Sequence, residues 1–191
     1  VGRPSGCDIH ILDDEAQPLP AGQRGKVFFS GRQAVSYHND EKKTAAARSP
    51  QGYSTMGDLG YVDADGYLFL TDREAFTIIS GGVNVYPREV EEAISTDSRV
   101  AEAAVFGSPD NDLGEAVTAV VELQRDYEPT LDIAKMIRER LRACLSPHKL
   151  PRKLAFVDQM PLTDSGKIHK ARLRETWESH CDHVYERTAL D

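Results

Sequence analysis

The pattern of apolar residues changes once along this 191-residue chain. Up to about residue 70, apolar and polar residues alternate in short runs separated by glycine-containing turns, which is typical of strands. Beyond Arg73, runs with helical spacing alternate with further strand-like runs. A chain of this length can bury one sizeable core or two small ones. The change therefore predicts two domains of different class, residues 1–71 and residues 72–191.

The first domain is predicted to be mainly β. The segment "CDIHILDD" alternates, "RGKVFFSGR" is a short apolar run between glycines, and "GYVDADGYLFLTDR" places Asp65-Gly66 between two aromatic runs. An Asp-Gly pair favours a hairpin, because glycine adopts positive φ without strain. The polar, alanine-rich segment "NDEKKTAAARSPQG" predicts a short helix and loop. Short strands at this spacing favour a small β-barrel or sandwich-like subdomain.

The second domain is predicted to be a compact α+β domain, which makes the whole chain α+β. "YPREVEEAIST" and "KARLRETWESH" are predicted helices, the first opened by Pro87 and the second carrying Leu173 and Trp177. The clearest helix lies in "TLDIAKMIRERLRACLSP", capped by Thr130 and stopped by Pro147. Its predicted apolar stripe is Ile133, Met136, Ile137, Leu141 and Cys144, and its basic C-terminal end holds Arg138, Arg140 and Arg142. "AEAAVFGSPD", "EAVTAVVELQ" and "KLAFVDQMP" are predicted strands.

Composition excludes several classes of partner. The formal net charge of -8 argues against nucleic acid and anionic membranes. No apolar run approaches the roughly 20 residues that span a bilayer. The three cysteines are far apart and odd in number, which favours a reducing cytoplasm. The cluster "HCDH" at His180–His183 has metal-ligating residue types but no matching second pair, so a solvated tail and no metal site are predicted.

Lys167 stands in "PLTDSGKIHK", directly after a Thr-Asp-Ser-Gly turn. The segment resembles a phosphate-binding P-loop only superficially. That motif needs a glycine where this chain has Pro161, and a Ser or Thr after the lysine where this chain has Ile168. The P-loop interpretation is therefore excluded, and the partner of Lys167 must be sought elsewhere in the sequence.

Two further stretches allow a binding role or a purely structural one. In "IISGGVNVYP", Ser80, Gly81 and Gly82 follow an apolar strand, and adjacent glycines permit close approach of a ligand or simply a tight turn. In "GYSTMGDLGY", Asp58 follows a glycine. An ionised carboxylate there can accept bonds from both hydroxyls of a ribose, but aspartate is also a good turn former.

Five blocks follow one another along the chain: "VGRP", "AGQRGKVFFSG", "GYSTMGDLGYVDADGYLFLTDR", "IISGGVNVYPREVEE" and "PLTDSGKIHK". Together they resemble the acyl- and aryl-CoA synthetases of the adenylate-forming superfamily, which also includes luciferase and peptide-synthetase adenylation domains. The resemblance extends from Val1 to about Glu175 and is closest to the CoA ligases. It implies the C-terminal portion of such an enzyme, with residues 1–71 as the final β subdomain of the large adenylating domain and 72–191 as the lid domain.

The resemblance also implies roles for particular residues. Asp58 would bind the ATP ribose, and Arg73 the ribose or phosphate side. Lys167 would be the catalytic lysine of adenylate formation. A flexible ammonium suits that step, because attack of a carboxylate on the α-phosphate joins two anions and builds up negative charge.

A second set of residues is implied for the reaction with CoA. Ser80, Gly81 and Gly82 would form the loop that receives the pantetheine arm, after the small domain rotates about a hinge. The hinge position corresponds to Ala75, where Lys or Asp is usual. Met56 replaces a commoner Thr or Ser before the Gly-Asp pair. Neither departure removes a residue to which the resemblance assigns ligand contact.

The implied reaction joins a small-molecule carboxylic acid to ATP and then passes the acyl group from AMP to CoA. The family's phosphate-binding loop, adenine motif and acyl pocket are not in this sequence. We therefore expect Mg²⁺ to be held by the remainder of the N-terminal domain, and the chain alone to be inactive. Two alternatives stay open: a non-catalytic binding or regulatory module with the lid fold, and a superfamily member with a carrier-protein or oxygen acceptor. The acid itself, whether fatty, aryl or sterol-type, is undetermined.

Overall fold

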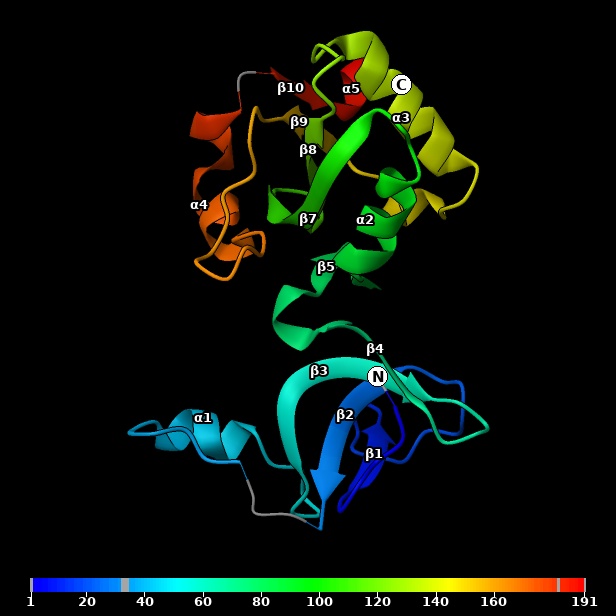
Figure 1. Ribbon diagram of the computed structural model, residues 1–191, viewed down its shortest axis with the longest axis vertical. Helices are drawn as coiled ribbons and strands as arrows, with labels where there is room; N and C mark the ends of the chain where they lie inside the picture. Colours follow the sequence, from blue (N-terminus) through cyan, green and yellow to red (C-terminus); the bar gives the residue numbers. More distant parts are fainter. Residues whose placement is uncertain (1, 32–34, 182, 191) are drawn as a thin grey trace. The chain divides into compact units, whose positions relative to one another are not determined.

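The computed structural model describes residues 2–31, 35–181 and 183–190. The chain divides into two compact units, Val1–Ala75 and Phe76–Asp191 (Figure 1). Strands dominate the first unit, whereas helices and strands are mixed in the second. The predicted α+β class is confirmed.

The first unit is built on one four-stranded antiparallel sheet. Its strands pair in the order β1-β2-β3-β4, and helix α1 lies in the connection between β2 and β3. The elements are β1 (Asp8–Leu12), β2 (Gly25–Ser30), α1 (Glu41–Ala46), β3 (Ser54–Val62) and β4 (Leu68–Arg73). Within the described residues β1 and β4 do not pair, so the sheet stays open and is not a closed barrel. Ile11, Val27 and Leu68 form its small buried core.

The hairpin predicted around Asp65-Gly66 is confirmed. It joins β3 to β4, and Gly66 has a φ of 82°. The Asp63 carboxylate accepts hydrogen bonds from the backbone N–H groups of Asp65 at 3.0 Å and Tyr67 at 2.8 Å. This Asx-type turn fixes the register of the two strands. The register places Asp58 on β3 directly opposite Arg73 on β4.

The second unit contains a mixed sheet. Its elements are β5 (Ile78–Ser80), β6 (Val83–Val85), α2 (Pro87–Ser95), β7 (Val100–Asp110), β8 (Gly114–Leu123), α3 (Leu131–Arg142), β9 (Lys153–Phe156), α4 (Lys170–His180), β10 (His183–Glu186) and α5 (Arg187–Leu190). Strand β8 pairs antiparallel with β7 and parallel with β9, and β10 pairs antiparallel with β9. Strands β5 and β6 form a hairpin, and β5 meets β8 at Ser80 and Gly114.

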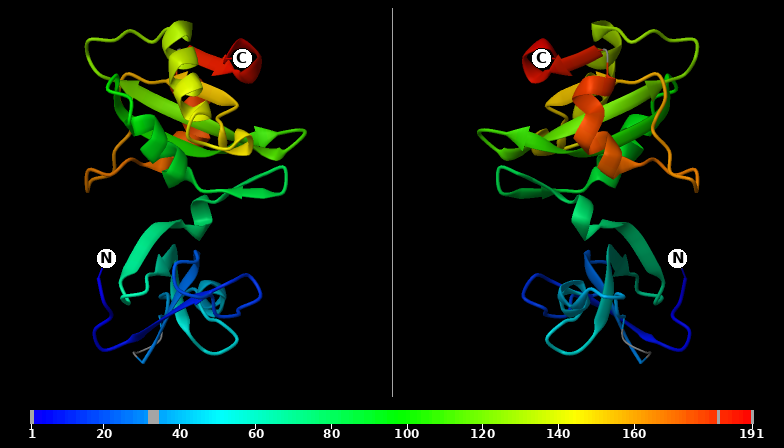
Figure 2. Two further views of the ribbon diagram at one scale, coloured as in Figure 1. Left: turned by 90° about the vertical axis from the view of Figure 1, so that its right-hand side faces the viewer. Right: turned by 90° about the vertical axis from the view of Figure 1, so that its left-hand side faces the viewer.

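Both faces of this sheet are covered. Alternate residues of β8 divide between two buried clusters: Val117, Ala119 and Val121 belong to the cluster with α2, α3 and α5, and Val120 to the cluster with α4. Figure 2 shows α3 in front of the sheet in one view and α4 in front in the opposite view. In the α4 cluster, the Trp177 ring lies 6.3 Å from that of Phe106. The sheet is therefore the middle layer of the unit.

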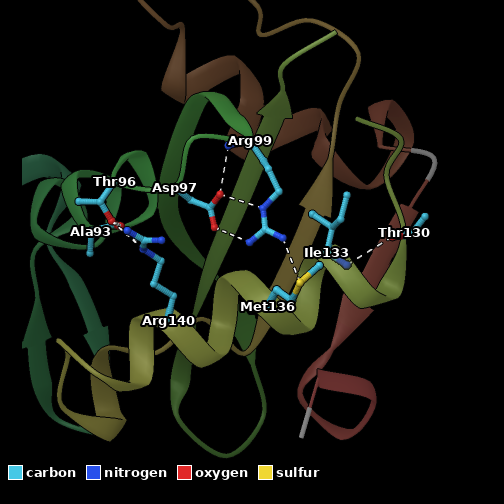
Figure 3. Close-up of polar contacts among 8 residues, drawn as sticks. All are labelled: Ala93, Thr96, Asp97, Arg99, Thr130, Ile133, Met136 and Arg140. Carbon is cyan, nitrogen blue, oxygen red and sulfur yellow. Dashed lines mark hydrogen bonds and ion pairs between the residues drawn. The ribbon is translucent and has the colours of Figure 1, made fainter. Parts of the chain in front are cut away.

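Helix α3 follows its predicted pattern only in part. The Thr130 side chain caps it by accepting a bond from the Ile133 N–H at 3.3 Å (Figure 3). Of the predicted apolar stripe, Ile133, Ile137 and Leu141 are buried, whereas Met136 and Cys144 are exposed. Arg138, expected at a basic surface end, is only 4% exposed. Pro147 opens a separate 3-10 turn, Pro147–Lys149, instead of ending α3 directly.

The solvated tail predicted for His180–His183 is wrong. Cys181 is buried in the α4 cluster, and the chain continues into β10 and α5, where Leu190 is also buried. Of this segment, Asp182 lies outside the described residues. The error arises because the few apolar residues of the tail are irregularly spaced, so no periodic pattern reveals the strand pairing with β9.

Candidate functional site

Asp58 and Arg73, the predicted nucleotide-binding pair, form an ion pair within the first unit. The Arg73 Nε lies 3.1 Å from Asp58 Oδ1, with the Asp58 side chain 17% exposed and the Arg73 side chain 61% exposed. Gly57, at a φ of 78°, bends β3 just before Asp58, and the strand pairing shifts register just after it. Such irregularities re-aim a side chain from a sheet. The pair leaves guanidinium N–H groups and a second carboxylate oxygen available to a ligand.

The predicted CoA loop is the turn of the β5–β6 hairpin in the second unit. Ser80 pairs with Val83, and Gly81 and Gly82 between them have φ values of 58° and 78°. A two-residue turn with positive φ at both positions requires residues such as glycine. The Gly81 N–H donates to the Leu113 carbonyl at 2.9 Å, which ties the turn to the β7–β8 connection. Ser80 itself is buried.

A cationic pocket of about 630 Å³ adjoins this turn. Ser80, Gly81 and Val83 form one part of its lining, and apolar residues such as Leu113 and Leu145 form another. Its remaining lining is basic: Arg138, Arg142, His148, Arg152 and Arg187. Arg152 also lies 3.9 Å from Asp110. A pocket with several guanidinium groups is suited to a ligand that bears phosphates.

Lys167 lies in a closed loop of the second unit, directly before Ile168 at the base of the loop. Leu162 and Ile168 form a β-bridge at its base. Within the loop, the Thr163 N–H donates to the Lys167 carbonyl at 2.7 Å, and Gly166, at a φ of 77°, donates to the Thr163 carbonyl. The Lys167 side chain is exposed, and no hydrogen bond or ion pair joins its ammonium to another residue that the structure describes. The backbone of Lys167 is therefore held by the hydrogen bonds of the loop, while its side chain is exposed to solvent.

The predicted hinge residue Ala75 is the last residue of the first unit. Glu74, just before it, is held to β2, because Lys26 Nζ lies 2.7 Å from its carboxylate. The hydrogen bond to Glu74 raises the pKa of Lys26, and Asp14 at 3.2 Å acts in the same direction. Phe76, just after Ala75, already belongs to the second unit.

Sequence reasoning missed four charged residues that hold α4 in place. Lys170 Nζ lies 2.7 Å from Glu91 Oε1, and Arg174 Nη2 lies 2.7 Å from Glu115 Oε1. Glu115 also accepts a bond from the Ile79 N–H at 2.9 Å, next to the glycine turn. Lys170 and Arg174 are four residues apart and therefore lie on one face of the helix. This spacing was the only feature of the sequence that could have indicated their ion pairs.

Two kinds of site are not found among residues 2–31, 35–181 and 183–190. No three His, Cys, Asp or Glu side chains in these ranges are grouped so as to hold a metal ion. In the same ranges, no helix has both the length and the apolar character needed to cross a membrane.

The residues singled out in the sequence lie in both units. The first unit holds the Asp58–Arg73 ion pair, and the second holds the glycine turn and the loop that contains Lys167. A family model described as the AMP-binding enzyme C-terminal domain matches residues 89–167. This chain therefore contains the C-terminal domain of the AMP-binding enzymes. The whole stretch from Glu89 to Lys167 lies in the second unit.

Three relatives illustrate the family. The chain is 35% identical over 184 residues to the mitochondrial acyl-coenzyme A synthetase ACSM3 of Mus musculus, covering 92% of this chain and 32% of that protein. The ATP-bound MatB structure from Rhodopseudomonas palustris matches with a TM-score of 0.81 at 32% identity, covering 92% of this chain and 35% of that one. The amide bond synthetase McbA from Marinactinospora thermotolerans matches with a TM-score of 0.79 at 38% identity, covering 93% and 36%. This chain thus spans about a third of such relatives.

Proposed function

We propose that this chain is the C-terminal part of an ATP-dependent acyl-CoA ligase. Such an enzyme first joins a carboxylic acid to ATP, releasing pyrophosphate and forming an acyl-adenylate. The CoA thiol then attacks the acyl carbon, which forms the thioester and releases AMP. The observation that carries the proposal is Lys167, an exposed lysine whose supporting loop is closed by its own hydrogen bonds.

In the first half-reaction, Lys167 would stabilise the negative charge that builds up at the α-phosphate. A preorganised cation costs little reorganisation at that moment, because its loop is already rigid. Asp58 would accept hydrogen bonds from the ribose hydroxyls, and Arg73 would donate to the nucleotide. Their 3.1 Å ion pair would hold the carboxylate in a fixed orientation toward the ribose. Mg²⁺, which would accompany ATP, is proposed to be bound by the N-terminal part of the enzyme.

In the second half-reaction, the Ser80–Gly82 turn would admit the pantetheine arm, since its two glycines present no side chains. Gly82 has open space around the position of a Cβ atom. The arginine-lined pocket beside the turn favours CoA over a carrier protein as acceptor. The nucleotide end of CoA bears a pyrophosphate and a 3′-phosphate, whereas the prosthetic group of a carrier bears a single phosphodiester.

The test uses the complete ligase, with this chain joined to its N-terminal adenylating domain. Lys167→Ala should lower the rate of acyl-adenylate formation about 10²- to 10³-fold, as expected for loss of one charge-stabilising donor. Attack of CoA on supplied acyl-adenylate should remain near the wild-type rate. Lys135→Ala, which removes an exposed lysine of α3 in the same unit, is the matched control. Equal loss of both half-reactions would contradict the role proposed for Lys167.

We also propose that the chain alone does not adenylate acids, and that it works in the cytoplasm. Exchange of pyrophosphate into ATP, measured at high concentration of the isolated chain with a panel of acids, should stay at background. A rate above background would instead mean that this chain contains a full adenylating site. Cell fractionation tests the location, which is supported by the three cysteines being free thiols.

A further inference from the structure

Lys170 anchors the first turn of α4, three residues beyond Lys167. Its ammonium lies 2.7 Å from one carboxylate oxygen of Glu91 and 2.9 Å from the other. The two side chains are only 20% and 16% exposed. The ammonium also lies 5.6 Å from the centre of the Phe76 ring. Such a shielded pair is screened by solvent far less than a surface pair, so it holds its geometry more firmly.

Glu91 in turn connects this ion pair to the sheet. It lies on α2, and its Oε1 atom accepts a hydrogen bond from the Val105 N–H of β7 at 2.7 Å. One carboxylate therefore joins α2, the central sheet and the start of α4. Helices α2 and α4 are thus joined by two residues that are 79 positions apart in the sequence.

The loop that carries Lys167 has no independent freedom at its base. The His169 N–H donates to the Pro161 carbonyl at 2.7 Å, directly beside the bridge between Leu162 and Ile168. Ile168 packs against the buried cluster beneath α4. The loop and the first turn of α4 therefore form one rigid piece. Fixing the first turn of α4 therefore also fixes Lys167, which stands beside Ile168 at the base of the loop.

We infer that Glu91 and Lys170 are positioning residues for Lys167, an inference that rests on the proposed function. They touch neither substrate nor nucleotide and act by fixing the support of the catalytic ammonium. A misplacement of about 1 Å in a reacting geometry can lower a rate about 10²-fold. Because Lys167 is proposed to act only in adenylate formation, loss of the pair should affect that half-reaction and spare the attack by CoA.

The kinetic test compares Glu91→Gln and Lys170→Met with a matched control in the complete ligase. The glutamine can still accept from the Val105 N–H, so the fold is retained while the charge is lost. The control is Glu92→Gln, on the next residue of the same helix, whose ion pair with Arg88 is exposed (57% and 66%). Both test variants should lower adenylate formation about tenfold or more, with CoA attack unchanged. Lys170→Arg keeps the positive charge, so it should retain most of the wild-type rate of adenylate formation that Lys170→Met loses.

Equal losses in both half-reactions, or the same loss in Glu92→Gln, would overturn the inference. A second measurement needs no catalysis: hydrogen exchange of the Thr163, Gly166 and Lys167 amides in the chain itself. All three are hydrogen-bonded within the loop. Exchange should be faster in Glu91→Gln and Lys170→Met but unchanged in Glu92→Gln and Lys170→Arg. If the wild-type ligase forms no adenylate, the proposed function fails, and this exchange experiment alone decides whether the pair positions the loop.

Discussion

Asp97 offers the sharpest test of what stabilises the second unit. It follows α2 and is only 3% exposed (Figure 3). Its two carboxylate oxygens accept from Arg99 Nη2 at 2.7 Å and Nε at 2.9 Å, and Oδ1 also accepts from the Arg99 backbone N–H at 3.1 Å. Arg99 reaches on to the Met136 sulfur of α3 at 3.0 Å. The pair thus links the end of α2 to α3.

Replacing Asp97 by Asn keeps the shape but removes the charge and one acceptor oxygen. The Asn amide nitrogen would then face a guanidinium N–H, so two donors oppose each other. Breaking a buried ion pair on one side costs about 3–5 kcal/mol, and a hydrogen bond to a charged group is worth about 1.5–3 kcal/mol. Arg99 is 19% exposed and can regain some hydration. The expected loss in unfolding free energy is therefore about 2–4 kcal/mol.

The effect should also depend on pH in a defined direction. Hydrogen bonds from the Arg99 guanidinium lower the pKa of Asp97 in the folded chain. Its stabilisation is therefore complete above the unfolded aspartate pKa of about 3.9, and it is lost as pH falls through the lower folded value. Below that value Asp97 is protonated and resembles Asn. The difference in unfolding free energy between wild type and Asp97→Asn should accordingly shrink in acid.

Urea unfolding monitored by Trp177 fluorescence at pH 7 and at several lower pH values measures both quantities. Glu92→Gln is the control, since its exposed i,i+4 pair should contribute no more than about 0.5 kcal/mol. A loss below about 0.5 kcal/mol in Asp97→Asn would refute the estimate. A difference that stayed constant between neutral and acid pH would refute the electrostatic explanation.

Three further substitutions test the turn, the nucleotide pair and the core. Gly81→Ala should lower the stability more than Gly82→Ala. Both glycines have positive φ, but only at Gly81 would an added Cβ lie as close as 3.1 Å to the Leu113 side chain. The melting temperatures of the two variants test this difference. In the complete ligase, Asp58→Asn should weaken ATP binding about tenfold or more in a titration, by loss of a charged acceptor. Trp177→Ala should lower the unfolding free energy by about 3–5 kcal/mol in urea, because it empties the α4 cluster.

The local sequence pattern predicted where the helices and strands lie. It was less successful in predicting which side chains of each element are buried. The cap at Thr130 and the buried Ile133 and Ile137 followed from spacing alone, since a helix cap and an apolar stripe are local properties. Met136 was assigned to the stripe because methionine is apolar, but its position lies at the edge of the contact face, where it meets Arg99. Arg138 is buried because it falls beside Ala134 and Leu141 on the packed side of α3. Which side of a helix is covered depends on neighbours that are distant in sequence.

Sequence patterns could not predict the strand pairing or the ion-pair network either, because both depend on contacts between residues that are distant in sequence. The parallel pairing of β8 with β9, and the addition of β10 to the sheet edge, join segments with a helix or a loop between them. Family resemblance supplied the candidate roles of Asp58, Arg73 and Lys167, and the pairing of the first two is seen in the structure. It did not supply Glu91 or Lys170, because their link is a contact across 79 residues.

Under the proposed function, Lys167 must leave the adenylate site before CoA attacks. The hydrogen-bonded loop that contains Lys167 limits how this movement can occur. Because Lys167 stands at the base of a loop closed by internal hydrogen bonds, we expect it to be withdrawn with the whole second unit and not by movement of the loop alone. Glu74 is held to the first unit by Lys26, and Phe76 belongs to the second. The three residues form the 3-10 turn Glu74–Phe76, and we propose Ala75, at its centre, as the pivot. Ala75→Pro, which restricts φ to about −65°, should slow overall acyl-CoA formation in the complete ligase while leaving at least one isolated half-reaction near the wild-type rate. Unchanged turnover in that variant would mean that Ala75 is not where the chain turns.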